Sequence, residues 1–152
     1  PVGSSMIGTL PEPGITAERT FQVERRHTTN LFGEQESPPG APAAADADPE
    51  ESIRVLGTPQ LLAEVEFLGR ESLHGTLPDG TGLVGIDATV THRKAVPIGR
   101  TVRVETELIA VSGRKITIEG TLYLSDSEAL VGEVTNRLQV VNRETFKDGI
   151  EK

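Results

Sequence analysis

One long apolar stripe with the period of a helix lies in the middle of the chain. From Pro59 to Leu73, apolar residues recur every three or four positions, which predicts one helix with a single buried face. Thr58 is expected to be its N-cap, because a hydroxyl followed by proline is a typical helix start. The stripe consists of Leu61, Leu62, Val65, Leu68, Gly69 and Leu73.

Alternating apolar and polar positions follow the predicted helix. They predict four strands, the first from Leu83 to His92, separated by turns rich in proline, glycine and serine. The inward positions are Ile86, Ala88 and Val90, then Val102, Val104, Thr106, Leu108 and Ala110, then Ile116, Ile118, Gly120, Leu122 and Leu124, and finally Leu130, Gly132, Val134, Leu138 and Val140. We therefore expect an α+β fold in which an antiparallel β-sheet wraps around one long central helix.

Two polar residues interrupt these apolar faces. Glu66 falls within the helical stripe, and His92 is in phase with the inward residues of its strand. If both faces meet in one core, the carboxylate and the imidazole would pair there, since a buried carboxylate is costly without a partner. Simpler interpretations remain open: Glu66 as a residue at the edge of the stripe, His92 as a structural or exposed histidine, and Thr58 as a cap only.

From Thr58 to Arg143 the sequence resembles the fluoroacetyl-CoA thioesterase-like family of hotdog-fold proteins. The similarity lies in the segments LPDGTGLVGIDATVTH and AVPIGRTVRVETEL and in the order helix, turn, strand. The resemblance implies that Thr58, Glu66 and His92 are the catalytic residues and that Gly85 helps to bind the acyl-CoA. Near the last strand Val134-Thr135-Asn136-Arg137 matches the family pattern only in part, so no function is carried onto it.

The function implied is that of an acyl-CoA thioesterase, which hydrolyses a small or medium acyl thioester to the free acid and CoA. An alternative is a non-catalytic acyl-CoA-binding hotdog protein. An enoyl-CoA hydratase is a weaker alternative, because Asp87 and His92 fall on opposite faces of their strand. We expect no cofactor other than the CoA of the substrate, and no metal site.

Composition restricts the partners. The chain of 152 residues has a formal charge of −8 and no cysteine, which argues against a nucleic-acid partner and against a disulfide framework. It has no apolar run of the ~20 residues that span a membrane, so we expect a cytoplasmic protein without a membrane partner. Eight helical residues separate Thr58 from Glu66, which is ~12 Å. Because hotdog proteins generally pair with sites at the interface, we expect a homodimer.

The chain divides into one domain and two flanks. Residues 1–18 are expected to be a tag remnant and an irregular N-terminus, 19–146 a single hotdog domain, and 147–152 a C-terminal tail. A first strand is predicted at Arg19–Glu24, which could extend as far as Phe32. His27 would then lie in an exposed basic patch able to attract CoA phosphates. The acidic, Pro/Ala-rich loop at 34–51 contains no large apolar side chain and is predicted to be disordered.

Overall fold

The structure is a computed structural model that describes residues 8–35 and 44–150. Residues 1–7, 36–43 and 151–152 lie outside the described part. The predicted tag remnant and the middle of the loop predicted at 34–51 fall on them.

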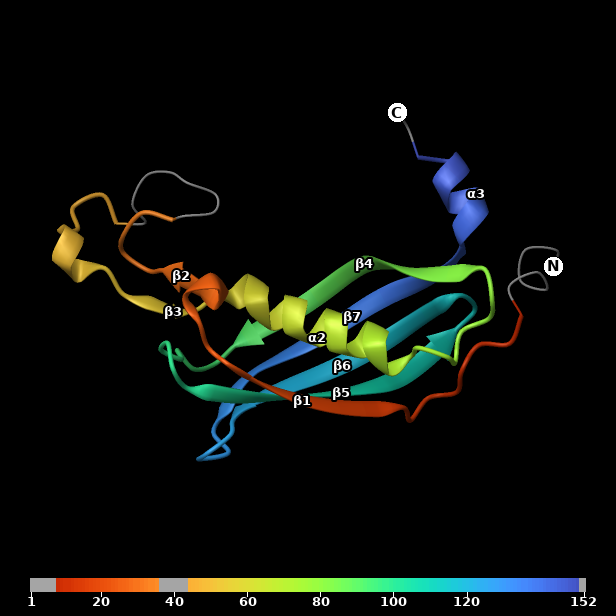
Figure 1. The fold of residues 1–152 in the computed structure, drawn as a ribbon, viewed down its shortest axis with the longest axis horizontal. Coiled ribbons are helices and arrows are strands. Elements are labelled where there is room, and N and C mark those ends of the chain that lie inside the picture. Colours follow the sequence, from red (N-terminus) through yellow and green to blue (C-terminus); the bar gives the residue numbers. More distant parts are fainter. Residues whose placement is uncertain (1–7, 36–43, 151–152) are drawn as a thin grey trace.

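A five-stranded antiparallel sheet forms the body of the molecule, and one long helix lies across one of its faces (Figure 1). The spatial order of the strands is β1-β5-β6-β7-β4. Their bounds are β1 Thr16–Gln22, β4 Thr81–His92, β5 Thr101–Ser112, β6 Lys115–Leu124 and β7 Leu130–Asn142. The helix, α2 (Thr58–Ser72), packs against all five strands. The predicted α+β hotdog arrangement is confirmed.

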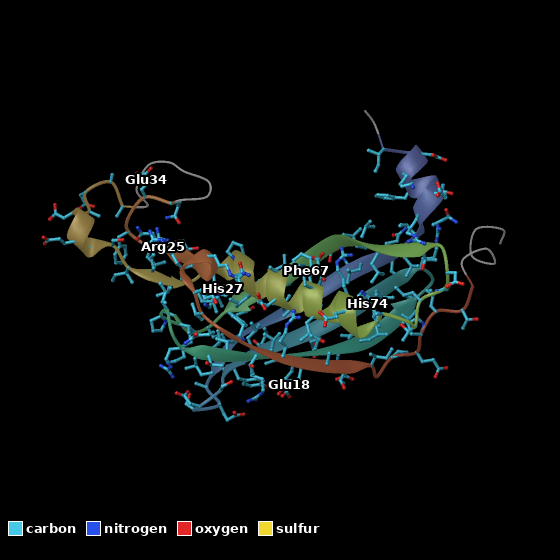
Figure 2. All side chains as sticks on the ribbon, viewed as in Figure 1. Glu18, Arg25, His27, Glu34, Phe67 and His74 are labelled. Atoms are coloured by element: carbon cyan, nitrogen blue, oxygen red, sulfur yellow. The ribbon has the colours of Figure 1, made fainter. Side chains whose placement is uncertain are left out.

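The predicted stripe of α2 is its buried face. Leu61, Val65 and Leu68 are buried against the sheet, and so is Leu73, which ends the helix. On the opposite side, Phe67 is 60% exposed (Figure 2). Helical propensity alone would not hold a helix of this length in water, so burial of this face is what stabilises α2.

Three glycines allow α2 to approach the sheet closely. A Cβ at Gly120 of β6 would overlap the side chain of Val65, and one at Gly132 of β7 would overlap that of Leu61. Gly69 does the same from the helix side, where a Cβ would lie 3.0 Å from Ile118 Cγ2. Gly120 and Gly132 were predicted to face inward, and they leave the space that the apolar side chains of the helix fill.

The inward face predicted for β5, β6 and β7 is largely confirmed, whereas that of β4 is wrong in part. Ile86 is 45% exposed, because a bulge between Gly85 and Asp87 shifts the register of β4 against β7. Ala88 is exposed as well, while Val90 remains half-buried. β4 is an edge strand, so its alternation is not enforced by a neighbour on both sides.

The N-terminal region differs from its prediction. β1 begins at Thr16 rather than Arg19 and ends at Gln22. The chain then forms a short 3₁₀ helix (Arg25–His27), after which β2 (Thr28–Asn30) pairs with β3 (Arg54–Leu56) in a separate two-stranded sheet. His27 is not in an exposed basic patch; it is 3% exposed.

Two further segments fall within predicted loop or tail. Residues Pro49–Glu51, inside the segment predicted to be disordered, form a 3₁₀ helix. At the C-terminal end α3 (Arg143–Asp148) continues directly from β7 and crosses the domain end expected at residue 146. The Asn142 side chain accepts a hydrogen bond from the Thr145 backbone N–H at 3.0 Å, which is an N-cap.

No helix within residues 8–35 and 44–150 is long and apolar enough to cross a membrane.

Candidate functional site

Thr58 is the first residue of α2 and not its cap. The N-cap is Gly57, which has extended backbone angles and makes no side-chain capping bond. The Thr58 hydroxyl is instead 2.8 Å from Nδ1 of His92, at the end of β4. The expectation of an N-cap is therefore wrong, because the hydroxyl has a partner on another element.

The partners of His92 define which ring nitrogen carries the proton. Its Nε2 lies 3.0 Å from the backbone carbonyl oxygen of Lys94. Because a carbonyl only accepts hydrogen bonds, Nε2 must be the protonated nitrogen of the neutral ring. Nδ1 then accepts, and the Thr58 hydroxyl donates to it. A hydroxyl that donates to an imidazole oriented by a third group has the geometry of an activated nucleophile.

This pair lies in a pocket of about 590 Å³ at the N-terminal end of α2. The start of the helix contributes Gly57, Thr58 and Pro59 to the wall. A helix N-terminus favours negative charge. The other lining residues are Thr29, Leu31, Val55, Leu56, His92, Arg93, Lys94 and Ala95. The pocket therefore combines apolar walls, two cationic residues and one hydrogen-bonded polar pair.

Glu66 does not pair with His92. Its carboxylate accepts two hydrogen bonds from Arg70, one turn further along α2, at 3.0 and 3.2 Å. The side chain of Glu66 is 23% exposed, so it is half-buried rather than in the core. The expected Glu66–His92 pair is wrong within one chain, because a closer cation on the same helix already satisfies the carboxylate.

A second, smaller pocket of about 300 Å³ brings Glu66 next to Gly85. A Cβ at Gly85 would be 3.3 Å from Oε1 of Glu66, so glycine leaves the space beside the carboxylate. Asn136 of β7 also lines this pocket. It is 2% exposed, its Nδ2 donates to the backbone oxygen of Asp87 at 3.1 Å, and its Oδ1 has no hydrogen-bond partner among the described residues.

Asp87 lies at the rim of the same pocket. Its carboxylate forms an ion pair with Arg137 across β4 and β7. The hydrogen bond from that guanidinium is the main reason why the pKa of Asp87 lies below its ordinary value. Asp87 is therefore a charged, paired group at the opening and not a proton donor near neutral pH.

The four predicted residues thus form two groups. Thr58 and His92 line the larger pocket, whereas Glu66 and Gly85 line the smaller one. Both Thr58 and Glu66 belong to the single helix α2, and eight residues of helix span ~12 Å. One chain does not bring the groups into contact.

Glu64 lies on the same helix, two residues before Glu66. It is half-buried and accepts a hydrogen bond from Gln60 at 3.1 Å. Its charge also acts on the imidazole of His27. Burial and the positive charge of Arg26 nevertheless keep the pKa of His27 below its ordinary value of 6.5.

Sequence reasoning missed Arg70, the carbonyl of Lys94 and Asn136. Arg70 follows Glu66 by four residues, and that spacing is the signal for a helical ion pair. Asn136 is in phase with the buried Val134 and Leu138 of β7, so a polar residue on an apolar face was visible there too. The Lys94 carbonyl left no signal, since any residue type supplies one.

Comparisons with known proteins give first the class. A solved structure of the fluoroacetyl-CoA thioesterase FlK is 25% identical, covers 91% of this chain and 93% of its own, and superposes with a TM-score of 0.73. A mutant of the same enzyme in complex with fluoroacetate and CoA is 27% identical, covers 90% and 99%, and has a TM-score of 0.71. A Thermus thermophilus hypothetical protein of the thioesterase superfamily shares the fold at 18% identity, covering 92% and 90%, with a TM-score of 0.72. The protein is a hotdog-fold thioesterase.

The family follows from the sequence itself. The family described as fluoroacetyl-CoA-specific thioesterase, FlK, matches residues 41–144, which is more than half of the chain. No curated protein matches the chain. The chain belongs to the FlK thioesterase family, and the predicted resemblance, fold and thioester hydrolase activity are confirmed.

Proposed function

We propose that the protein hydrolyses a small or medium acyl-CoA thioester to the free acid and CoA, with Thr58, His92 and Glu66 as its catalytic residues. The observation that carries the proposal is the Thr58–His92 hydrogen bond of 2.8 Å inside the 590 Å³ pocket. No cofactor is required beyond the CoA of the substrate. The acyl-CoA-binding alternative, without catalysis, would use the same pocket but would not need this polar pair.

The pair is suited to the reacting thioester. With Nε2–H donated to the Lys94 carbonyl, Nδ1 of His92 is a base toward the Thr58 hydroxyl. Thr58 then acts either as the nucleophile or as the hydroxyl that orients the thioester carbonyl. In either case the start of α2 favours the negative charge that develops on the carbonyl oxygen.

Glu66 is the candidate base for the attacking water. Its Oε1 lies 3.3 Å from the position that a Cβ of residue 85 would occupy, so glycine at this position leaves room for the water and the thioester beside the carboxylate. The water would lose a proton to the carboxylate and form the C–O bond. The C–S bond then breaks, and the CoA thiolate leaves and takes up the proton.

The anionic end of CoA has a matching surface. Arg93 and Lys94 line the larger pocket, although the chain as a whole has a formal charge of −8. A local cationic rim on an acidic protein concentrates a phosphorylated ligand at that point. Arg93 also forms an ion pair with Glu133 at 2.7 Å, so the phosphates of CoA would compete with that carboxylate for the guanidinium.

A homodimer would join the two groups of residues. β4 is an edge strand, and Ile86 on it and Phe67 on α2 are exposed apolar side chains. A long unpaired edge with apolar residues is a typical surface for a second copy. If the two β4 edges meet around a twofold axis perpendicular to the strands and helices, the two α2 helices run antiparallel, and the Thr58 end of one α2 would approach the Glu66 region of the other. One complete site would then take residues from both subunits.

A thiol-release assay over a panel of acyl-CoAs of increasing chain length tests the proposal. Glu66→Gln keeps the shape of the side chain but removes the base, and kcat should fall by roughly 10². Glu71→Gln is the matched control, because Glu71 lies on the same helix and its side chain is 60% exposed. Ligand binding without thiol release for every acyl-CoA would favour the non-catalytic alternative.

A further inference from the structure

Arg70 contacts both the candidate base and the sheet. Its Nε and Nη2 donate to the same oxygen, Oε2 of Glu66, at 3.2 and 3.0 Å. Its Nη1 donates to the backbone oxygen of Leu83 in β4 at 2.8 Å. The guanidinium is therefore fixed at one end by the helix and at the other by the strand that carries Gly85.

This arrangement distinguishes the two oxygens of Glu66. Oε2 is occupied twice, whereas Oε1 has no hydrogen-bond partner among the described residues. Both oxygens lie beside the Cβ position of Gly85, Oε1 at 3.3 Å and Oε2 at 3.4 Å. Arg70 thus occupies one of the two carboxylate oxygens beside Gly85 and leaves the other free to accept a proton.

An ordinary ion pair on the surface of a helix would not hold a carboxylate in one orientation. Surface pairs at this spacing are mobile and contribute only about 0.3–0.5 kcal/mol. Here both side chains are half-buried, with Arg70 29% and Glu66 23% exposed, and a third hydrogen bond leads to another element. A planar guanidinium makes these bonds in fixed directions, which a lysine ammonium would not.

We infer that Arg70 is a positioning residue for catalysis: it holds Glu66 beside Gly85 with Oε1 free to take the proton of the water that attacks the thioester. The inference rests on the proposed function, since it assigns Arg70 a role through Glu66. Without Arg70 the carboxylate would rotate between several conformers, and only some would place a free oxygen at the attacking water. Catalysis loses rate steeply when a reacting group is misplaced by as little as an ångström.

Steady-state kinetics of Arg70→Met and Arg70→Lys test the inference. For Arg70→Met, kcat should fall by about 10- to 100-fold while KM changes by less than about threefold, because orientation of the base and not substrate binding is lost. Arg70→Lys should recover only part of kcat. Arg19→Met is the matched control: it removes the exposed ion pair of 3.0 Å between β1 and Glu71 of the same helix, and should leave kcat unchanged.

Two additional measurements separate positioning from a general effect on folding. Millimolar guanidinium should restore part of kcat to Arg70→Ala, because the half-buried site is open to a small cation. Arg70→Met should also cost nothing further in a Glu66→Gln background, since residues that act as a unit are not additive. If Arg70→Met lowers kcat further in the Glu66→Gln background, Arg70 has a purely structural role and the inference is overturned.

The outcomes distinguish this inference from the proposed function. Wild-type kcat in Arg70→Met beside an impaired Glu66→Gln would overturn the role of Arg70 alone. A Glu66→Gln protein with wild-type turnover would overturn both.

Discussion

Gly85→Ala is a minimal change at the center of the proposed site. The new Cβ would lie 3.3 and 3.4 Å from the two carboxylate oxygens of Glu66 and 3.6 Å from its Cδ. The contacts with the two oxygens are at or just below the shortest ordinary van der Waals distances, so the carboxylate would have to move away by a few tenths of an ångström. It cannot do so freely, because Arg70 holds Oε2 at 3.0 Å.

The expected effect falls on activity rather than on stability. Gly85 has no positive φ, so alanine is compatible with its backbone. Replacing glycine at such a position stabilises by about 0.4–1 kcal/mol through the unfolded chain, which offsets part of the steric cost. Displacement of the base and the methyl group in the pocket should lower kcat by about tenfold and raise KM.

Gly82→Ala is the control. It lies on the same strand, and its new Cβ would also be 3.3 Å from a neighbour, but that neighbour is the flexible Cγ of Arg143. Thiol release and the melting temperature should be measured for both variants. Wild-type kcat and KM in Gly85→Ala would refute the placement of Glu66 beside Gly85 as the reacting position.

Two further predictions follow from individual contacts. Thr58→Val removes the hydroxyl bonded to His92 but keeps the side-chain shape, so kcat should fall by roughly 10². The free energy of unfolding should change by less than about 0.5 kcal/mol, because Thr58 is exposed. Unchanged thiol release would contradict the role of Thr58 as an activated hydroxyl. His27 tests the effect of burial. Desolvation and the charge of Arg26 lower the pKa of His27 in the folded protein below its ordinary value of 6.5. Below pH 6.5 the unfolded chain therefore takes up a proton that the folded chain does not. The free energy of unfolding falls as the pH decreases, until the lowered pKa of the folded state is reached. In His27→Gln, chemical denaturation at a series of pH values should lack this fall; an equal slope in both proteins would exclude His27 as its source.

The carboxylates affect stability in a different pH window. Hydrogen bonds from arginine lower the pKa of Asp87, Asp126 and Glu128. Their stabilising contribution is present above the ordinary values of 3.8 and 4.5 and is lost as the pH falls further. The slope assigned to His27 therefore lies at higher pH than theirs.

The helix and three of the long strands could be predicted because their burial repeats regularly. In α2 and in β5, β6 and β7, a covered face forces apolar residues into phase with 3.6 or 2 residues. β4 was predicted less well, since an edge strand tolerates the bulge at Ile86. The turn from β1 to β2 is short and irregular, and the burial of His27 depends on distant packing that local periodicity does not encode.

The residues of the site could be predicted from the sequence, but their hydrogen-bond partners could not. Phase and resemblance selected Thr58, Glu66, His92 and Gly85, yet the structure pairs Thr58 with His92 and Glu66 with Arg70. The choice of partner depends on side-chain reach across elements, and periodicity reports only which face a residue occupies. Arg70 shows that a spacing rule applied to Glu66 would have corrected the pairing.

The most direct test of the central claim is complementation between two inactive variants. Thr58→Val and Glu66→Gln proteins would be purified separately, mixed after reversible unfolding and refolded together. If one site combines Thr58 and His92 of one subunit with Glu66 of the other, half of the dimers formed at random are mixed and each carries one intact site, so thiol release should return to about a quarter of the wild-type rate. No recovery, with mixed dimers demonstrated by mass spectrometry, would contradict a site shared between subunits.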